Sequence, residues 1–384
     1  MKTPRSRLLA LTTLAMLSTL PLAGCDHGPR TLSIGVLVAQ TGNSGPRGKD
    51  LLNGATLAAE EINRSDLTID GTPLRVEIKA TDDKGEVEAA IAQAHDLIET
   101  GIDTMIGPVN SNQAAAVIPI VAAKGLPQMI TATSASLLAL GHGNVLRLLA
   151  NDDQQGRAIA SFAAETLHAQ RIAIVMERSD YGRGLDASVV ATLAKRGVAP
   201  LVTTEVDDNK APLAPETIAQ FQADKVDTIV FLAREPQLVA LMEALGKAGW
   251  TDVAVVGTNV IRNKSVAHRP VAIRALYATA TAIDAKEFPQ GKEFLEHFQK
   301  RFGGDPVWGA QYAYDAVYAL ADAAHQGRSL AASDLVGTLK RIEPGTKVNQ
   351  QMRFAANGEQ VYPAIGVYKV EREAWAMQMM SATW

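Results

Sequence analysis

The sequence predicts an α/β protein made of two doubly wound lobes joined by a multi-strand hinge. Short apolar runs alternate with segments of helical spacing from residue 31 onward, a pattern typical of parallel sheets covered by helices. There are more apolar runs than one compact sheet holds, so we expect two sheets. The composition allows this, because 47% of the 384 residues are hydrophobic.

The first 24 residues are predicted to be an export signal peptide. Three basic residues, Lys2, Arg5 and Arg7, precede an uncharged apolar stretch over 8–20 that is too short to span a bilayer. The stretch ends at L-A-G-C over 22–25, which resembles a bacterial lipobox. An uncleaved anchor helix is the alternative. We expect a periplasmic protein that is lipid-anchored to the cell membrane.

Cys25 is the predicted site of lipidation. It is the only cysteine, so neither an internal disulfide nor a thiolate metal site is expected. Lipidation gives a single exported cysteine a sufficient role. Residues 25–30 would then be a lipidated tether ahead of the folded part.

The folded part is predicted to open with a strand over 31–39, a glycine-rich turn over 40–48 and a helix over 49–63. A glycine turn before a helix raises the possibility of a nucleotide site. However, five residues separate Gly42 from Gly48 where a phosphate loop has four, and Asp50 stands where a Ser or Thr is needed. We therefore expect no cofactor, and a turn that lets a ligand approach the backbone.

The alternation of strands and helices continues to the end of the chain. Strands are predicted over 74–80, 104–106, 129–130, 144–148, 171–176, 198–206, 228–232, 253–256 and 276–283, followed by a β-rich tail over 352–370. Helices are predicted over 86–99, 112–124, 153–167, 184–196, 215–224, 237–248, 291–301, 308–325 and 332–341.

The chain is predicted to cross between the two lobes several times. Residues 31–149 and 281–348 are assigned to the first lobe, and residues 150–280 and 349–384 to the second. Asp152 or Asp153 is expected to cap the helix that follows the first crossing. Two lobes joined by several crossings form a hinge, and the space between them is the default ligand site.

Two serines are predicted to meet at one edge of the first sheet. Ser111 and Ser134 each follow a short apolar run, and the helix over 112–124 connects the two runs. In a parallel sheet both turns fall at the carboxyl edge, where ligands bind and helices present free N–H groups. The alternative is that both serines only cap helices, since Ser is among the preferred capping residues.

Several segments together resemble one known family. They are residues 34–63, I-G-P-V-N-S over 106–111, G-L-P-Q over 125–128, N-D-D-Q-Q-G over 151–156 and S-D-Y-G-R-G-L over 179–185. In this order they resemble the branched-chain amino-acid-binding proteins of ABC importers. The resemblance implies the type I periplasmic binding fold, with two Rossmann-like lobes.

The resemblance also implies a function. It suggests a monomeric solute-binding lipoprotein that delivers a small carboxylate-bearing solute, an amino acid or a related compound, to ABC permease subunits by hinge closure. The alternative is an exported ligand sensor or envelope regulator that uses the same fold without transport.

Four ligand-binding positions follow from the resemblance. Ser111 and Ser134 fall where the family grips the carboxylate and amino group of its ligand, and Thr133 falls where it uses backbone atoms. Tyr181 falls on the aromatic residue that packs on the ligand from the second lobe.

Three further site residues depart from the family pattern. Arg47 and Arg234 stand where the family has aromatic residues, and Asn259 stands where it has the acid that pairs with the ligand's ammonium. Either arginine could instead face solvent or pair with a nearby acid, as Arg234 could with Glu235.

The departures also suggest what the ligand is. An arginine that faced the site would need charge from the ligand or from an acid. We expect a ligand more negative than a neutral branched-chain amino acid, with Glu177 or Asp180 as candidate ammonium partners.

Other function classes have no support in the sequence. The formal net charge is -4 without any basic run, which argues against nucleic acid. The seven His are scattered without H-E-x-x-H spacing, and no G-x-S-x-G motif occurs. We therefore expect no catalytic residue, no metal site and no enzyme activity.

Overall fold

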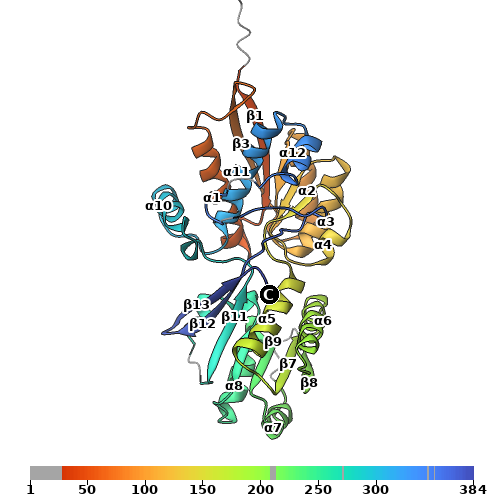
Figure 1. The fold of residues 1–384 in the computed structure, drawn as a ribbon, viewed down its shortest axis with the longest axis vertical. Coiled ribbons are helices and arrows are strands. Elements are labelled where there is room, and N and C mark those ends of the chain that lie inside the picture. The colour runs from red at the N-terminus through yellow and green to blue at the C-terminus, as the bar shows by residue number, and fades with distance from the viewer. Residues whose placement is uncertain (1–27, 208–212, 270–271, 344–345, 350) are drawn as a thin grey trace, which may run out of the picture.

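The protein forms two lobes, each built on one mainly parallel sheet (Figure 1). A computed structural model describes residues 28–384 apart from 208–212, 270–271, 344–345 and 350. The predicted signal peptide and Cys25 therefore lie outside the described residues. The predicted α/β class with two sheets is confirmed.

The first lobe contains a six-stranded sheet in the order β2-β3-β1-β4-β5-β6. Its strands are β1 (Arg30–Val38), β2 (Thr68–Ile69), β3 (Thr72–Asp82), β4 (Thr104–Ile106), β5 (Gln128–Ile130) and β6 (Val145–Arg147). All neighbours are parallel except β2 and β3. The early helices are α1 (Gly45–Ile62), α2 (Val87–Glu99), α3 (Ser111–Ala123) and α4 (Ser136–Ala139).

Helices from late in the chain complete the first lobe, as the sequence predicted. They are α10 (Gly291–Phe302), α11 (Ala310–Gly327) and α12 (Ala332–Leu339), of which α11 and α12 are drawn in blue beside the red and orange elements in Figure 1. The side chains of α11 share one core with those of β1 and α1. β1 is buried from Leu32 to Val38 and so reads as a continuous apolar run.

The second lobe contains a seven-stranded sheet in the order β13-β12-β11-β10-β9-β7-β8. Its strands are β7 (Ile172–Glu177), β8 (Val202–Val206), β9 (Thr228–Leu232), β10 (Ala254–Gly257), β11 (Ala275–Ala280), β12 (Ile365–Glu371) and β13 (Ala374–Ser381). Its longer helices are α5 (Asp152–Ser161), extended by the π-helix η1 (Phe162–Thr166), α6 (Asp180–Lys195), α7 (Pro215–Ala223) and α8 (Glu235–Lys247). Shorter ones are η2 (Asn259–Ile261), α9 (Lys264–Ala267) and η3 (Ala285–Glu287).

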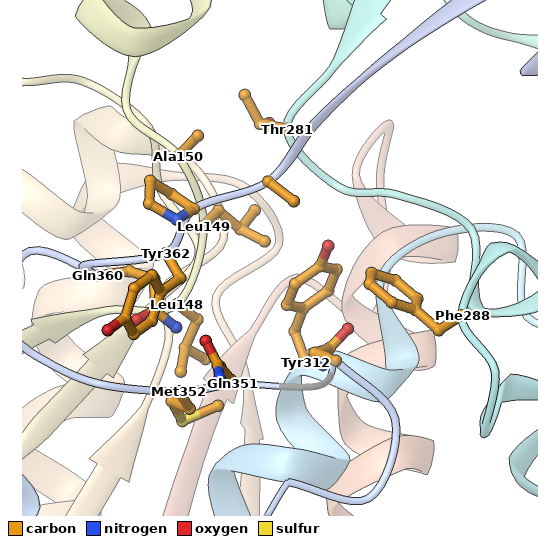
Figure 2. Close-up of a pocket in the computed structure, with 13 residues that line it drawn as sticks. Leu148, Leu149, Ala150, Thr281, Phe288, Tyr312, Gln351, Met352, Gln360 and Tyr362 are labelled. Atoms are coloured by element: carbon orange, nitrogen blue, oxygen red, sulfur yellow. The ribbon is translucent and has the colours of Figure 1, made fainter. Parts of the chain in front are cut away.

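Three crossings between the lobes meet around one small cavity. Leu149 and Ala150 follow β6, Thr281 follows β11, and Tyr362 precedes β12; Figure 2 shows them around the cavity. The cavity volume is about 20 Å³, enough for about one water molecule. It is too small for an organic solute, so a site for one must lie elsewhere.

The tail of the chain differs from the prediction. A β-rich stretch was expected over 352–370, whereas the strands are β12 and β13, which form an antiparallel hairpin at the edge of the second sheet. Arg372 and Glu373 make its turn at φ angles of 50° and 62°. Gly or Asn usually occupies such positions, and neither occurs here, so no turn could be predicted at this point.

The residues before this hairpin pack on the first lobe. Phe354 pairs with Gln360 in an isolated bridge, and Arg147 of β6 donates its N–H to the carbonyl of Gly358 at 2.9 Å. The predicted lobe boundaries stay predictions, but these contacts favour placing the last crossing after Gln360 instead of at residue 349.

The first helix of the second lobe is capped by another residue than predicted. Asn151, not Asp152 or Asp153, is the N-cap of α5, and it forms a capping box with Gln154. Each side chain accepts from the other's backbone N–H, at 2.9 and 2.8 Å. Asp152 is thereby left as the first helical residue with its carboxylate uncommitted to the cap.

Within the described part of the chain, no helix is long and apolar enough to cross a membrane.

Candidate functional site

The loops at the carboxyl edge of the first sheet are tied to one another. Ser44, after β1, exchanges side-chain hydrogen bonds with Asn110, after β4, at 3.2 and 3.3 Å. Asp82 at the end of β3 accepts from the backbone N–H of Gln40 at 2.7 Å and from the hydroxyl of Thr41 at 2.7 Å. The glycine-rich turn is thus held in one conformation on this edge.

Ser111 and Ser134 lie together, as the parallel topology predicted. The N–H of Ser134 donates to the hydroxyl of Ser111 at 3.3 Å, and both residues are half-buried. Neither serine is the capping residue, since Asn110 is the N-cap of α3 and Ala135 that of α4. The capping alternative is wrong. A bond of 3.3 Å is long, so the N–H of Ser134 and the hydroxyl of Ser111 could each donate to a better acceptor.

A buried arginine supports the loop that carries Thr133 and Ser134. The Arg147 side chain has no exposed surface, and it donates to the carbonyls of Ala132 and, at 2.9 Å, Ser134. It also pairs with Glu359 at 3.0 Å. Sequence reasoning missed this support, although an arginine inside an otherwise apolar strand was a visible signal.

Tyr181 belongs to the first turn of α6 in the second lobe. Ser179 caps this helix by accepting from the N–H of Gly182 at 3.1 Å. The hydroxyl of Tyr181 is buried and faces the side chain of Thr258. Burial raises the pKa of Tyr181, and the nearby Asp152 raises it further. The tyrosine is therefore neutral and has hydrogen-bonding capacity to spare.

Arg234 pairs with an acid, but not with the neighbour that was considered. Its Nε lies 3.1 Å from the carboxylate of Glu177, and its guanidinium lies 5.7 Å from the centre of the Tyr181 ring. The Glu177 side chain is 1% exposed, against 55% for Arg234. Glu235 instead accepts from Asn263 at 2.9 Å and from Ser265. The charge of Arg234 is largely balanced within the protein.

The two acids that were expected to replace the ammonium partner are not free for that role. Glu177 pairs with Arg234 and also accepts from the Ser179 hydroxyl at 2.6 Å. The Asp180 side chain is fully exposed and pairs with Arg183 at 2.9 Å. That expectation is contradicted by these contacts.

Arg47 faces the second lobe. It lies on the first turn of α1, with its guanidinium 5.6 Å from the centre of the Trp308 ring. Burial lowers the pKa of Arg47; Tyr181 opposes this effect, while Arg262 and Arg234 add to it. These three residues belong to the second lobe, so Arg47 is near enough to feel their charge. Within the described chain no carboxylate pairs with Arg47.

Asp152 is a site residue that the sequence did not reveal. Its N–H donates to the carbonyl of Thr133 at 2.9 Å, and its side chain is buried, with one carboxylate oxygen that has no partner among the described residues. Burial raises the pKa of Asp152 to about 6, although the Thr133 hydroxyl and Arg147 act in the opposite direction. The Asn151-to-Gln154 capping box was the signal that could have shown Asp152 to be free.

Asn259 begins the 3-10 helix η2 at the carboxyl end of β10. It is half-buried, and its side chain makes no hydrogen bond to the described residues. The adjacent Thr258 is fully buried, and its hydroxyl lies close to that of Tyr181. Both residues fall on the same edge of the second sheet as Tyr181 and Arg234.

Residues of both lobes therefore gather at one place, which we call the interlobe site. The first lobe and the crossing after it contribute Arg47, Ser111, Thr133, Ser134 and Asp152, and the second lobe contributes Tyr181, Arg234, Thr258 and Asn259. No group of three or more His, Cys, Asp or Glu that could hold a metal occurs among the described residues. The groups present can bind charges and hydrogen-bonding groups of a small molecule.

Two open α/β sheets whose carboxyl edges present polar side chains to each other across a hinge define a two-lobed ligand-binding protein. The family comparison agrees: the model of the periplasmic binding proteins matches residues 31–374. The chain belongs to this family, and the resemblance to branched-chain amino-acid-binding proteins drawn from the sequence is confirmed.

Individual relatives are similar over different lengths. The Leu/Ile/Val-binding protein BraC3 of Rhizobium johnstonii is 30% identical over 230 residues, which are 60% of this chain and 60% of that protein. The alignment thus spans less than two thirds of that relative. The amino acid binding protein of Pseudomonas aeruginosa is 27% identical over 77% of this chain and 79% of its own.

Solved structures share the fold over nearly the whole length. The branched-chain amino acid substrate-binding protein LivJ of Streptococcus pneumoniae, in complex with isoleucine, is 20% identical with a TM-score of 0.75, over 92% of this chain and 99% of its own. At this identity the likeness establishes the fold alone.

Proposed function

We propose that this protein is an extracytoplasmic solute-binding protein of an ABC importer that binds a small carboxylate-bearing solute in the interlobe site. One observation carries the proposal: Ser111 and the N–H of Ser134 meet at 3.3 Å at the carboxyl edge of the first sheet. A carboxylate is a better acceptor than the serine hydroxyl for that N–H, and it would sit at the start of α3, where the helix dipole favours an anion.

The relatives support the same class of ligand. BraC3 carries the name of a Leu/Ile/Val-binding protein, and the similar P. aeruginosa protein that of an amino acid binding protein. Amino acids bring both a carboxylate for the serines and an ammonium for an acid. The interlobe site has donors for the first group and, in Asp152, an acceptor for the second.

A binding screen tests the proposal. Thermal unfolding of the mature protein is measured with amino acids, dicarboxylates and amides, and the affinity of every hit is measured by calorimetry. We expect Ser111→Ala to weaken binding tenfold or more, because a hydrogen bond to a charged group contributes about 1.5–3 kcal/mol. Ser65→Ala, in the exposed turn that follows α1, is the matched control. A screen in which no carboxylate-bearing compound binds would overturn the proposal.

The importer role requires a test in cells. Deletion of the gene should abolish uptake of the solute that binds the purified protein. Uptake that is unchanged in the deletion strain, with binding intact, would favour a sensor that uses the same fold.

Lipid anchoring at Cys25 is part of the proposal and rests on the sequence alone. The charged start, the short apolar run and the L-A-G-C end occur together. We expect Cys25→Ser to leave an unprocessed precursor. Mass spectrometry of the mature protein would contradict the anchor if it found an unmodified Cys25 or cleavage at another position.

A further inference from the structure

Two charged groups of the interlobe site lack a counterion. No carboxylate lies within 4.0 Å of Arg47 in the described part of the chain, and no cation lies within 4.0 Å of Asp152 there. Arg47 is half-buried against Trp308, and Asp152 is 9% exposed. Leaving such charges unpaired is unfavourable, and more so once the lobes close over them.

The arginines around the site other than Arg47 are already paired, and the acid next to Asp152, Asp153, is exposed to solvent. Arg234 binds Glu177 at 3.1 Å, and Arg147 binds Glu359 at 3.0 Å. Arg262 binds Asp284 through two hydrogen bonds of 2.9 and 3.1 Å. These pairs leave one positive and one negative group, Arg47 and Asp152, for a ligand.

Tyr181 is close to both unpaired groups. Arg47 and Asp152 each interact electrostatically with this one ring, and Asp152 also contacts Thr133 on the first lobe. A ligand lying against Tyr181, with its carboxylate at Ser111 and Ser134, would lie near both Asp152 and Arg47. The buried hydroxyls of Tyr181 and Thr258, which lie close to each other, supply further polar contacts.

We propose that the site selects an amino acid whose side chain ends in a second carboxylate, with its ammonium at Asp152 and its side-chain carboxylate at Arg47. This inference rests on the proposed function and specifies its ligand. An aliphatic amino acid would leave Arg47 without a counterion in a closed site. A dicarboxylate without an ammonium would leave Asp152 facing a second negative charge.

Three closely related probes separate the two contacts. L-glutamate carries both groups, L-glutamine lacks the side-chain charge, and glutarate lacks the ammonium. Calorimetry on the wild-type protein should show L-glutamate binding about tenfold or more tightly than either analogue, because each charge-assisted bond is strong. L-leucine should bind more weakly still.

Single substitutions should remove the two preferences independently. In Arg47→Gln the preference for glutamate over glutamine should disappear, while the preference over glutarate remains. In Asp152→Asn the reverse is expected. Lys49→Gln is the matched control, because it removes one positive charge from an exposed position on the same turn of α1. Each preference is a ratio measured on one variant, so a change in folding cannot imitate it.

The outcomes distinguish this inference from the function on which it rests. If L-leucine or L-glutamine binds wild type as tightly as L-glutamate, and Arg47→Gln changes nothing, the acidic ligand is wrong and the binding function stands. If none of these compounds binds but another carboxylate-bearing compound of the screen does, the acidic amino acid is likewise wrong and the binding function stands; if no carboxylate-bearing compound of the screen binds, both are wrong. Loss of both preferences in the Lys49→Gln control would also overturn the assignment to Arg47.

Discussion

At the scale of single residues, the position of a partner decides what a charged side chain does. Arg234 could be weighed only against its neighbour Glu235 in the sequence, yet its partner Glu177 is 57 residues away. The pairing of Ser111 with Ser134 was predictable, because both follow adjacent strands of a parallel sheet. The lack of a counterion at Arg47 was not predictable, because it depends on where the fold places every acid of the chain.

Asp152 gives the first prediction, a pH dependence of binding. Its pKa in the ligand-free protein is raised to about 6 by burial, and the charged or titratable groups near it are Arg147, Asp153 and Tyr181. An ammonium binds the ionised carboxylate, so affinity should be full above pH 6 and fall as the pH drops through it. At pH 5 only about a tenth of Asp152 is ionised, which predicts about a tenfold loss of affinity for L-glutamate.

Calorimetry at about pH 7.5 and about pH 5 measures this dependence. The side-chain carboxylate of glutamate titrates near 4.3, below the window, and so contributes little. The Asp152→Asn variant is the control, because its affinity should not change with pH in this range. An equal pH slope in wild type and variant would exclude Asp152 as the titrating group.

At the scale of elements, the periodicity of apolar residues predicts the helices and central strands, but it does not predict which elements contact one another. Strand β9 over Thr228–Leu232 matches the predicted range, because a short apolar run bounded by polar residues specifies a buried parallel strand. The hairpin of β12 and β13 was missed at its turn, where Arg372 and Glu373 adopt positive φ without Gly or Asn. Both turn residues are exposed, and the pairing of Glu371 with Ala374 across the hairpin closes the turn.

Arg147 gives a prediction at this scale, because it ties β6 to the loop after β5 and to the segment before β12. Arg147→Met keeps an apolar stem of similar length but removes the donors to Ala132 and Ser134 and leaves Glu359 without its cation. Removing one partner of a buried ion pair costs about 3–5 kcal/mol. Because Glu359 is partly exposed, we expect the free energy of unfolding to fall by about 3 kcal/mol, the lower end of this range.

Urea unfolding of both proteins measures this loss. Arg353→Met is the control, since its pair with Glu343 at 3.3 Å is exposed and should contribute less than about 1 kcal/mol. Ligand affinity should also fall in Arg147→Met, because Ser134 is no longer fixed. A variant as stable as wild type would show that the loop is held without Arg147.

At the scale of the whole molecule, the fold was the most predictable feature. Alternating strands and helices specify doubly wound sheets, and their number requires two of them. The return of α10, α11 and α12 to the first lobe was also predicted. The predicted lobe boundaries stay predictions, and the contact of Gly358 with β6, which spans more than two hundred residues of sequence, favours a later last crossing.

The last prediction is that closure of the lobes depends on ligand. Three crossings join the lobes, and closure would bury Arg47 further without a counterion, because Arg234 and Arg262 of the second lobe are already paired with acids; the empty site therefore opposes closure. A ligand carboxylate at Arg47 removes that cost, and the ligand can favour the closed state only through contacts made by both lobes. Small-angle scattering should therefore give a smaller radius of gyration with saturating L-glutamate, or with the tightest ligand of the screen, than without it. The Tyr181→Ala variant, which loses the contact from the second lobe, should need more ligand for the same decrease, whereas Lys49→Gln should behave as wild type. An identical radius with and without a saturating, tightly bound ligand would exclude hinge closure as the way this protein presents its solute.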